Sequence, residues 1–372
     1  MSEKATYLPG LNGVRAIAAS IVLLWHTDEY ASLFGLSPYG YGKTGMGGSA
    51  VTFFFVLSGF LITLLLLQEK ARFGTVDVPR FYGRRILRIW PVYYVAVAAA
   101  FLWVGGLPTD QWPQTVSWVT PLTLYGTFLP NAAYAFGVSV RSIQPLWSVG
   151  VEEQFYLLWP WVVRASKNLL ATLFGIAMLV VVIKTSLRIW ENGPLLRLAR
   201  LTSIDSMAVG GMLAWLVHHR HPFLRYLYSR AIQIFCWLFF LICVFYKPLQ
   251  FTSLYDSELH ALIYAGIIAN VSTNPRTIIS LENSVFNFVG RVSYGLYVYH
   301  MLVICVLAAK LSPSTLSFCP ERGRLLVVIL AVYFLTLAVA LISYRFMESP
   351  LLEMKKKLAR VQSTDKKSDA DE

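Results

Sequence analysis

Long apolar runs follow one another along almost the whole chain and are separated by short polar segments. Each run approaches the length of about 20 residues that an α-helix needs to cross a bilayer. This alternation is typical of an all-α, polytopic membrane protein. The runs cover residues 13–34, 49–68, 89–107, 116–134, 148–165, 169–187, 203–218, 231–247, 257–273, 292–310 and 324–346.

The run at residues 116–134 differs from the others. It contains Pro121, Pro130 and many polar side chains, a combination that a membrane-spanning helix rarely tolerates. We expect this run to form an interfacial or re-entrant segment on the extracytoplasmic side. About ten transmembrane helices then remain.

The composition fits a membrane protein, and it determines how the net charge of the chain is interpreted. Only 14% of the residues are charged, 56% are hydrophobic, and the mean hydropathy is +0.56. A soluble domain usually carries about 25% charged residues. The net charge of +12 therefore reports on membrane topology and does not indicate nucleic-acid binding.

The positions of the basic residues favour a cytoplasmic N-terminus and a cytoplasmic C-terminus. In this orientation most loop lysines and arginines face the cytoplasm, as the positive-inside rule requires. The opposite loops hold fewer of them: Lys43, Arg141, Arg188, Arg197, Arg200, Lys247 and Arg322.

We expect one integral-membrane domain over residues 1–352, followed by a disordered cytoplasmic tail over residues 353–372. The tail is rich in charge and poor in apolar residues. No signal-cleavage pattern precedes Leu11, so the first apolar run should be retained as a span. No metal site is expected, because metal-ligand spacing is missing from the four cysteines, Cys236, Cys243, Cys305 and Cys319.

The first apolar run carries two ionisable residues, Arg15 and His26. On a helix they fall within about 20° of the same face and stand about 16 Å apart along the axis. Ionisable residues inside a membrane normally face a polar cavity, so the pair suggests a polar track through the protein. The alternative is that Arg15 marks the cytoplasmic flank and His26 lies at the far interface.

Two further segments combine charge with an apolar setting. Arg85 and Arg88 share a helical face where the third span enters the membrane, a position that suits a phosphorylated ligand or anionic lipid headgroups. Glu152 and Glu153 begin another span, where one carboxylate could accept a hydrogen bond from His26. They could instead be acids that stabilise the first turn of a helix.

Other polar residues could line the same track. Ser293 and His300 lie two helical turns apart and Tyr297 lies between them, although a lone histidine is often structural. Asp205, near the start of another span, fits either a helix N-cap or a cavity residue.

Together these segments resemble acyltransferase family 3, whose membrane proteins transfer acyl groups to cell-envelope saccharides. The segments that carry the resemblance are LNGVRAIAASIVLLWH (11–26), AVTFFFVLSGFLIT (50–63), RILR (85–88), WSVGVEEQFYLLWP (147–160) and SYGLYVYH (293–300). They occur in the order found in the family, and the likeness covers roughly residues 8–350. The sequence departs from the family pattern at Asn12, Thr52, Val149 and Gly150.

The resemblance implies an inner-membrane O-acyltransferase of the stand-alone type, without a C-terminal hydrolase-like domain. It would transfer an acyl group from a cytoplasmic acyl-CoA to a hydroxyl of a cell-surface or lipid-linked saccharide. Acetyl, carried by acetyl-CoA, is the acyl group expected. Acyl-CoA, the glycan and membrane lipids would be its partners, with no nucleic acid and no metal.

The resemblance also implies roles for individual residues. His26 would act as a general base or carry the acyl group itself. Glu152, or Glu153 in second place, would orient His26 or bind the acceptor. The donor would be held by Arg15, Arg85 and Arg88, and the cavity would be completed by Trp147, Ser148, Ser293, Tyr297 and His300.

Two other classes of protein are compatible with the same pattern. A transporter or permease could use the arginine, histidine and glutamate side chains as a proton or solute path without chemistry. However, the sequence contains no internal repeat and no corresponding pair of broken helices. A purely structural membrane protein would leave the shared face of Arg15 and His26 unexplained.

Overall fold

The fold is described by a computed structural model that covers residues 6–102, 117–245, 254–311, 319–358, 360–361 and 363–364. Most of this part of the chain is helical, and a short parallel pair of strands is formed by β1 (Thr6–Tyr7) and β2 (Ser363–Thr364). The structure confirms the all-α, polytopic membrane fold that the sequence predicts.

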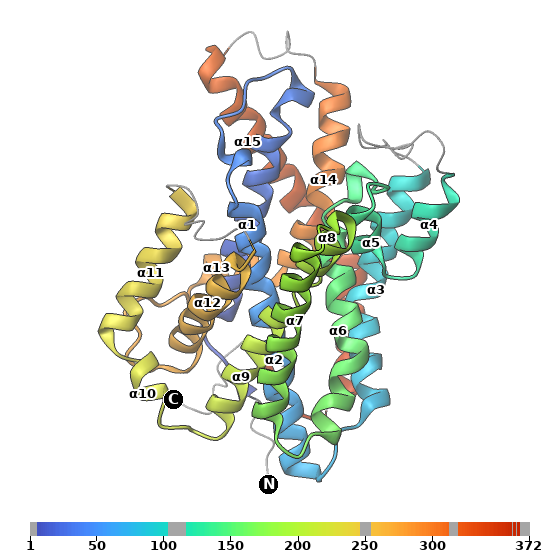
Figure 1. Cartoon of the computed structure of the whole chain (residues 1–372). Helices are drawn as coiled ribbons and strands as arrows, with labels where there is room; N and C mark the ends of the chain where they lie inside the picture. The colour runs from blue at the N-terminus through green and yellow to red at the C-terminus, as the bar shows by residue number, and fades with distance from the viewer. Residues whose placement is uncertain are drawn as a thin grey trace.

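The longer helices follow the apolar runs closely (Figure 1). They are α1 (Leu11–Glu29), α2 (Met46–Phe73), α3 (Val78–Leu102), α6 (Leu146–Ala165), α7 (Leu169–Ile189), α9 (Ile204–His218), α11 (Arg230–Phe245), α12 (Asp256–Thr273), α14 (Ser293–Lys310) and α15 (Glu321–Ser343). Shorter helices connect them: α4 (Val119–Gly126), α5 (Pro130–Ala135), α8 (Gly193–Thr202), α10 (Leu224–Leu227), α13 (Ser284–Arg291) and α16 (Ser349–Lys357). Single turns at η1 (Ala31–Phe34), η2 (Tyr41–Lys43), η3 (Arg141–Ile143) and the π-turn η5 (Tyr344–Glu348) complete the chain.

Within the described residues, five helical segments are long and apolar enough to cross a membrane. They are Met46–Phe73, Val78–Leu102, Leu169–Ile189, Ser293–Lys310 and Gly323–Lys355. The described part of the run at 116–134 forms the short helices α4 and α5, neither of which is long enough to span a bilayer. The count of ten spans and the orientation stay predictions.

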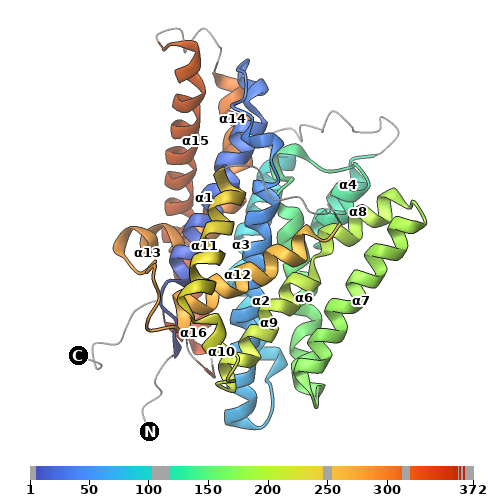
Figure 2. The ribbon, with the colours of Figure 1, turned by 60° about the vertical axis from the view of Figure 1, so that its left-hand side comes forward.

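Helix α2 runs through the middle of the bundle, whereas α7 and α15 lie at opposite edges (Figure 2). It crosses α9 so closely that side chains are excluded at the crossing. A Cβ atom on Gly59 would lie 2.0 Å from the Met207 carbonyl oxygen, and one on Gly210 would lie 2.1 Å from that of Val56. These glycines allow the helix backbones to touch, as small residues commonly do in membrane proteins.

A buried ionic cluster ties α7 to α9 and α12. The Lys184 ammonium lies 2.7 Å from a carboxylate oxygen of Asp205 and 2.9 Å from one of Glu258. The Lys184 side chain is 0% exposed, so the two acids provide its charged partners inside an apolar bundle. Asp205 is therefore an ion-pair partner of Lys184. It is neither the N-cap of α9, which is Ser203, nor a lining residue of either cavity described below.

The expected tail begins inside ordered structure. Helix α16 continues to Lys357, and two contacts fix the segment that follows it. Arg84 donates a hydrogen bond to the Leu358 carbonyl at 3.0 Å, and Arg360 lies 3.0 Å from the Asp77 carboxylate. The expected tail thus includes part of α16 and these two contacts, and its disorder stays a prediction. Residues 365–372 lie outside the described part of the chain.

We expect Gly59→Ala to destabilise the protein by about 1–3 kcal/mol, the usual range for overpacking, because its methyl group would collide with the Met207 backbone. Thermal unfolding of the purified protein in detergent measures the effect. Gly175→Ala in α7 is the matched control, since nothing lies within 4 Å of its added carbon. Equal midpoints for the two variants would contradict the close crossing.

We expect Lys184→Met to lower the free energy of unfolding by about 3–5 kcal/mol, because it leaves two acids without their cation. The triple variant Lys184→Met/Asp205→Asn/Glu258→Gln removes the charges together and should regain most of the loss. The same thermal unfolding assay compares both proteins. A triple variant as unstable as the single one would mean that the charges themselves do not matter.

Candidate functional site

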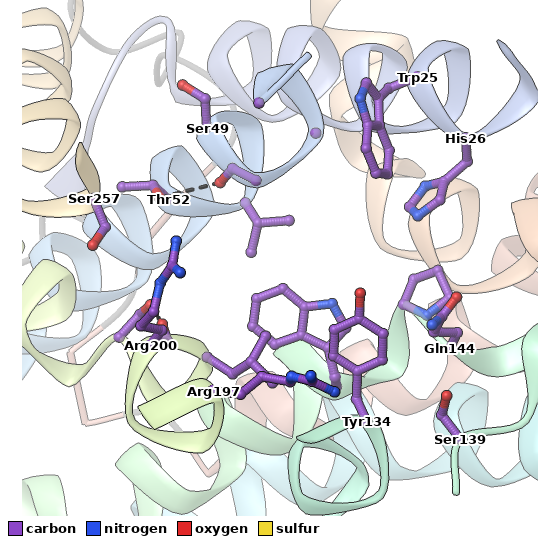
Figure 3. Close-up of a pocket in the computed structure, with 18 of the residues that line it drawn as sticks. Trp25, His26, Ser49, Thr52, Tyr134, Ser139, Gln144, Arg197, Arg200 and Ser257 are labelled. Atoms are coloured by element: carbon purple, nitrogen blue, oxygen red, sulfur yellow. Dashed lines mark hydrogen bonds between the residues drawn. The ribbon is translucent and has the colours of Figure 1, made fainter. Parts of the chain in front are cut away.

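Two cavities lie one after the other along α1. The larger has a volume of about 910 Å³ and is formed by α1, α2, α5, α6, α8, α12 and α14 (Figure 3). The smaller has a volume of about 100 Å³ and is formed by α1, α2, α3, α6 and α14. Arg15 lines the smaller cavity and His26 the larger. The two residues therefore mark successive polar chambers, as their shared helical face suggests.

His26 projects from α1 into the larger cavity (Figure 3). Its Nδ1 atom lies 3.1 Å from the Val22 carbonyl oxygen and 3.1 Å from Nε2 of His300. His300 is completely buried, and its own Nδ1 lies 2.5 Å from the Tyr297 carbonyl oxygen. Helix α14 thus supports the catalytic candidate on α1 through a histidine–histidine contact.

These contacts define a consistent set of tautomers for the neutral rings. A carbonyl oxygen only accepts, so His300 Nδ1–H donates to Tyr297 and leaves His300 Nε2 as an acceptor. His26 Nδ1–H then donates toward His300 and Val22, and His26 Nε2 carries the free lone pair. That lone pair has no hydrogen-bond partner among the described residues and is available to a ligand in the larger cavity.

The smaller cavity gathers the three predicted donor-binding arginines, Arg15, Arg85 and Arg88. Arg85 is only 8% exposed, and its guanidinium stacks over Tyr156 with its carbon 5.5 Å from the ring centroid. The neighbouring Arg84 has a different task, since it pairs with Glu69 at 3.4 Å. Three guanidinium groups around so small a space suit an anionic or strongly polar ligand.

The two glutamates occupy different surroundings, and neither contacts His26. Glu152 lines the smaller cavity and accepts hydrogen bonds from Ser58 at 3.0 Å and Tyr156 at 2.9 Å. Glu153 lines neither cavity and accepts a hydrogen bond from Trp90 at 2.8 Å. The hydrogen bond from His26 to a glutamate, which the sequence allowed, is not among the contacts of these residues in the structure. Glu152 lies beside the arginines of the smaller cavity, and His300 of α14 contacts His26 instead.

Tyr297 forms the partition between the cavities and lines both of them. Its hydroxyl donates to the Pro145 carbonyl oxygen at 3.0 Å and lies 2.7 Å from the Ser148 hydroxyl. Trp147 faces the larger cavity, and Ser148 and Ser293 face the smaller one. A group that passed from one cavity to the other would have to displace the Tyr297 side chain.

The chain matches the acyltransferase domain model of acyltransferase family 3 over residues 8–345. It belongs to this family. The match confirms the resemblance seen in the sequence motifs. The two cavities are therefore the candidate acyltransferase site of this chain.

Curated relatives of this acyltransferase family 3 chain include two bacterial proteins. It is 26% identical to the peptidoglycan O-acetyltransferase OatA of Listeria monocytogenes, over 93% of this chain and 56% of the relative. It is 25% identical to the O-acetyltransferase OatA of Staphylococcus aureus, over 93% of this chain and 57% of the relative. The chain thus spans little more than half the length of these relatives. No solved structure matches it.

The structure gives physical reasons for two departures from the family pattern. Gly150 packs against α5, where a Cβ atom would lie 2.5 Å from the Pro130 ring, so a larger residue does not fit. The Asn12 side chain accepts a hydrogen bond from Arg15 at 3.0 Å, as an aspartate would, but supplies no negative charge. Thr52 lines the larger cavity with a neutral hydroxyl.

One basic pair at the larger cavity was not among the site residues predicted from the sequence. Arg197 and Arg200 line the larger cavity from α8, although they were counted only as loop charges (Figure 3). A signal was present, because Asn192 caps the helix and the motif RLAR repeats the spacing of RILR at residues 85–88. Metal chemistry has no comparable signal, since no group of three or more potential ligands occurs among the described residues.

Proposed function

We propose that this chain is an O-acetyltransferase of the bacterial inner membrane. It moves an acetyl group from cytoplasmic acetyl-CoA to a hydroxyl of a cell-envelope saccharide. The observation that carries the proposal is the pairing of His26 with His300 at the wall of a 910 Å³ cavity, next to a second cavity lined by three arginines. Membership of acyltransferase family 3 supports the reaction class.

The smaller cavity suits the acyl end of the donor. At about 100 Å³ it has room for a thioester and part of the adjoining chain, but not for a whole coenzyme A molecule. The phosphates of the donor would remain toward the cytoplasmic end, within reach of Arg85 and Arg88. Bidentate arginine contacts are well matched to phosphate groups. Glu152 would balance part of this positive charge.

The larger cavity suits the acceptor. Its volume lies within the range of sites that enclose small ligands, about 300–1,000 Å³. The names of the relatives, which include a peptidoglycan O-acetyltransferase, favour a cell-wall glycan as the acceptor. The orientation predicted from the positive-inside rule supports this assignment, because the cavity would then lie toward the extracytoplasmic side, where such a glycan is found.

In the proposed reaction His26 acts as a general base. Its Nε2 atom takes the proton of the acceptor hydroxyl while that oxygen attacks the thioester carbonyl carbon. The carbon–sulfur bond breaks, an ester forms, and the proton passes from His26 to the departing thiolate. The thioester must reach His26 past Tyr297, so rotation of this side chain away from Ser148 and Pro145 would precede the transfer.

Replacement of His26 by alanine should lower acetyl transfer by about 10²–10⁴-fold, the usual contribution of a general base, while the protein remains folded. Acetyl-CoA consumption by the purified full chain in detergent measures the loss. Radiolabelled acetyl groups found on wild-type protein but not on His26→Ala would instead assign His26 as an acyl carrier. Unchanged turnover would remove His26 from the chemistry.

Arg85→Ala/Arg88→Ala should raise the KM for acetyl-CoA and weaken binding of CoA itself. The matched control is Arg225→Ala/Arg230→Ala, which removes two exposed arginines on the same predicted side of the membrane. CoA binding by the control but not by the test variant supports the donor site. Absence of specific CoA binding by folded wild-type protein would favour a transporter that uses the same polar path.

His300→Ala should lower kcat by about tenfold and leave the KM for acetyl-CoA unchanged, because one hydrogen bond that positions His26 is lost. His300→Gln offers a side-chain oxygen that can accept from His26 and should recover part of the rate. A purely structural role would lower the amount of folded protein in both variants and would not separate kcat from KM.

A further inference from the structure

The larger cavity contains its own pair of arginines. Arg197 and Arg200 lie three residues apart on α8, and Figure 3 shows both on the side of the cavity facing Trp25 and His26. Their spacing is that of Arg85 and Arg88, whose helix lines the smaller cavity. Each cavity therefore has one arginine pair on a single helical face.

The α8 pair is only weakly engaged by the protein itself. Arg197 donates one long hydrogen bond, of 3.4 Å, to the Ala135 carbonyl oxygen. The guanidinium of Arg200 forms no hydrogen bond or ion pair with any residue in the described part of the chain. Both side chains are exposed to the cavity, so their charges are available to a ligand.

The other charged groups around the cavity do not cancel this pair. Glu29 and Asp256 are its acidic lining residues, and Arg141 is a third arginine. Three guanidinium groups thus face two carboxylates, with the imidazoles of His26 and His260 in addition. Ser49 and Thr52, in the N-terminal part of α2, contribute hydroxyl groups and no charge.

Aromatic side chains lie beside the arginines. Trp147 and Tyr134 stack with ring centroids 6.4 Å apart and an interplanar angle of 13°, and both line the cavity. Flat apolar ring faces next to polar side chains suit the C–H faces and hydroxyl groups of a sugar. Gln144 and Ser139 add hydrogen-bonding groups on the same side (Figure 3).

We infer that the larger cavity selects an anionic saccharide, whose carboxylate or phosphate group is bound by Arg197 and Arg200 while a sugar hydroxyl lies at His26. Paired arginines on one helical face recognise such oxyanions through charge-assisted hydrogen bonds. The inference rests on the proposed function, because it assigns this cavity to the acceptor. It adds that the acceptor is anionic and that Arg197 and Arg200 bind its charged group.

Binding of defined saccharides to the full chain tests this selectivity without requiring turnover. The His26→Ala protein is used as the host, so the acceptor is not consumed, and quenching of tryptophan fluorescence reports occupancy beside Trp25 and Trp147. The probes are a neutral N-acetylglucosamine tetramer and a peptidoglycan tetrasaccharide whose muramic acid units carry carboxylates. A polyprenyl pyrophosphate-linked disaccharide presents phosphate instead.

We expect at least one anionic probe to bind about 10- to 100-fold more tightly than the neutral tetramer, the range for hydrogen bonds to charged groups. Arg197→Gln/Arg200→Gln should abolish this preference and leave binding of the neutral tetramer unchanged. Arg188→Gln/Arg225→Gln, which removes two exposed arginines outside both cavities, should retain it. Whichever anionic probe depends on the pair identifies carboxylate or phosphate as the recognised group.

Equal binding of the neutral and anionic probes, or a preference that survives Arg197→Gln/Arg200→Gln, would overturn the inference. Loss of CoA binding in the same double variant would also overturn it, because the pair would then belong to the donor site. None of these three results contradicts the proposed transfer of acetyl from acetyl-CoA to a saccharide. That proposal fails separately, if wild-type protein neither binds CoA nor transfers acetyl groups.

Discussion

The contact between the backbones of α2 and α9 is the constraint on which the site depends. At Gly59 and Gly210 no side chain separates the two helices, so α9 is held at a fixed distance from the middle of the bundle. Helix α8 leads directly into α9 and therefore takes its position from this crossing. Both α2 and α8 line the larger cavity, and α8 contributes its two arginines. The distance between these two sides of the cavity is thus set by one backbone contact, which side-chain rotation cannot adjust.

Around that crossing the protein divides its polar groups between two chambers. The smaller cavity is lined by three arginines, whereas the larger is wide enough for a sugar and carries aromatic surfaces. Tyr297 keeps them apart with hydrogen bonds to Ser148 and Pro145. In the proposed reaction the two substrates would approach from different sides of the membrane, and such a partition would keep water from the thioester between them.

The sequence predicted the helical fold well, because helices follow from local rules of period and length. It failed where side chains from distant segments choose their partners. His26 and His300 are 274 positions apart, and only the packing of α1 on α14 brings them to 3.1 Å. From the sequence, a glutamate was the candidate partner of His26, but the rotation of α6 that turns Glu152 toward Ser58 cannot be deduced from helical periodicity. Lys184 went unnoticed because its two acids lie on other helices.

The cluster at Lys184 has a consequence for how the chain enters the membrane. Its helix is otherwise apolar and is synthesised before either acid, since Asp205 follows 21 residues later and Glu258 follows 74 residues later. An ammonium group in lipid without a counter-ion costs several kcal/mol, so insertion of α7 alone into the bilayer is unfavourable. The helix must stay near water or near the translocon until α9 and then α12 arrive. A charge therefore orders the assembly of α7, α9 and α12 in time. The larger cavity is complete only after α14, which supplies Tyr297 to its wall, has also been synthesised.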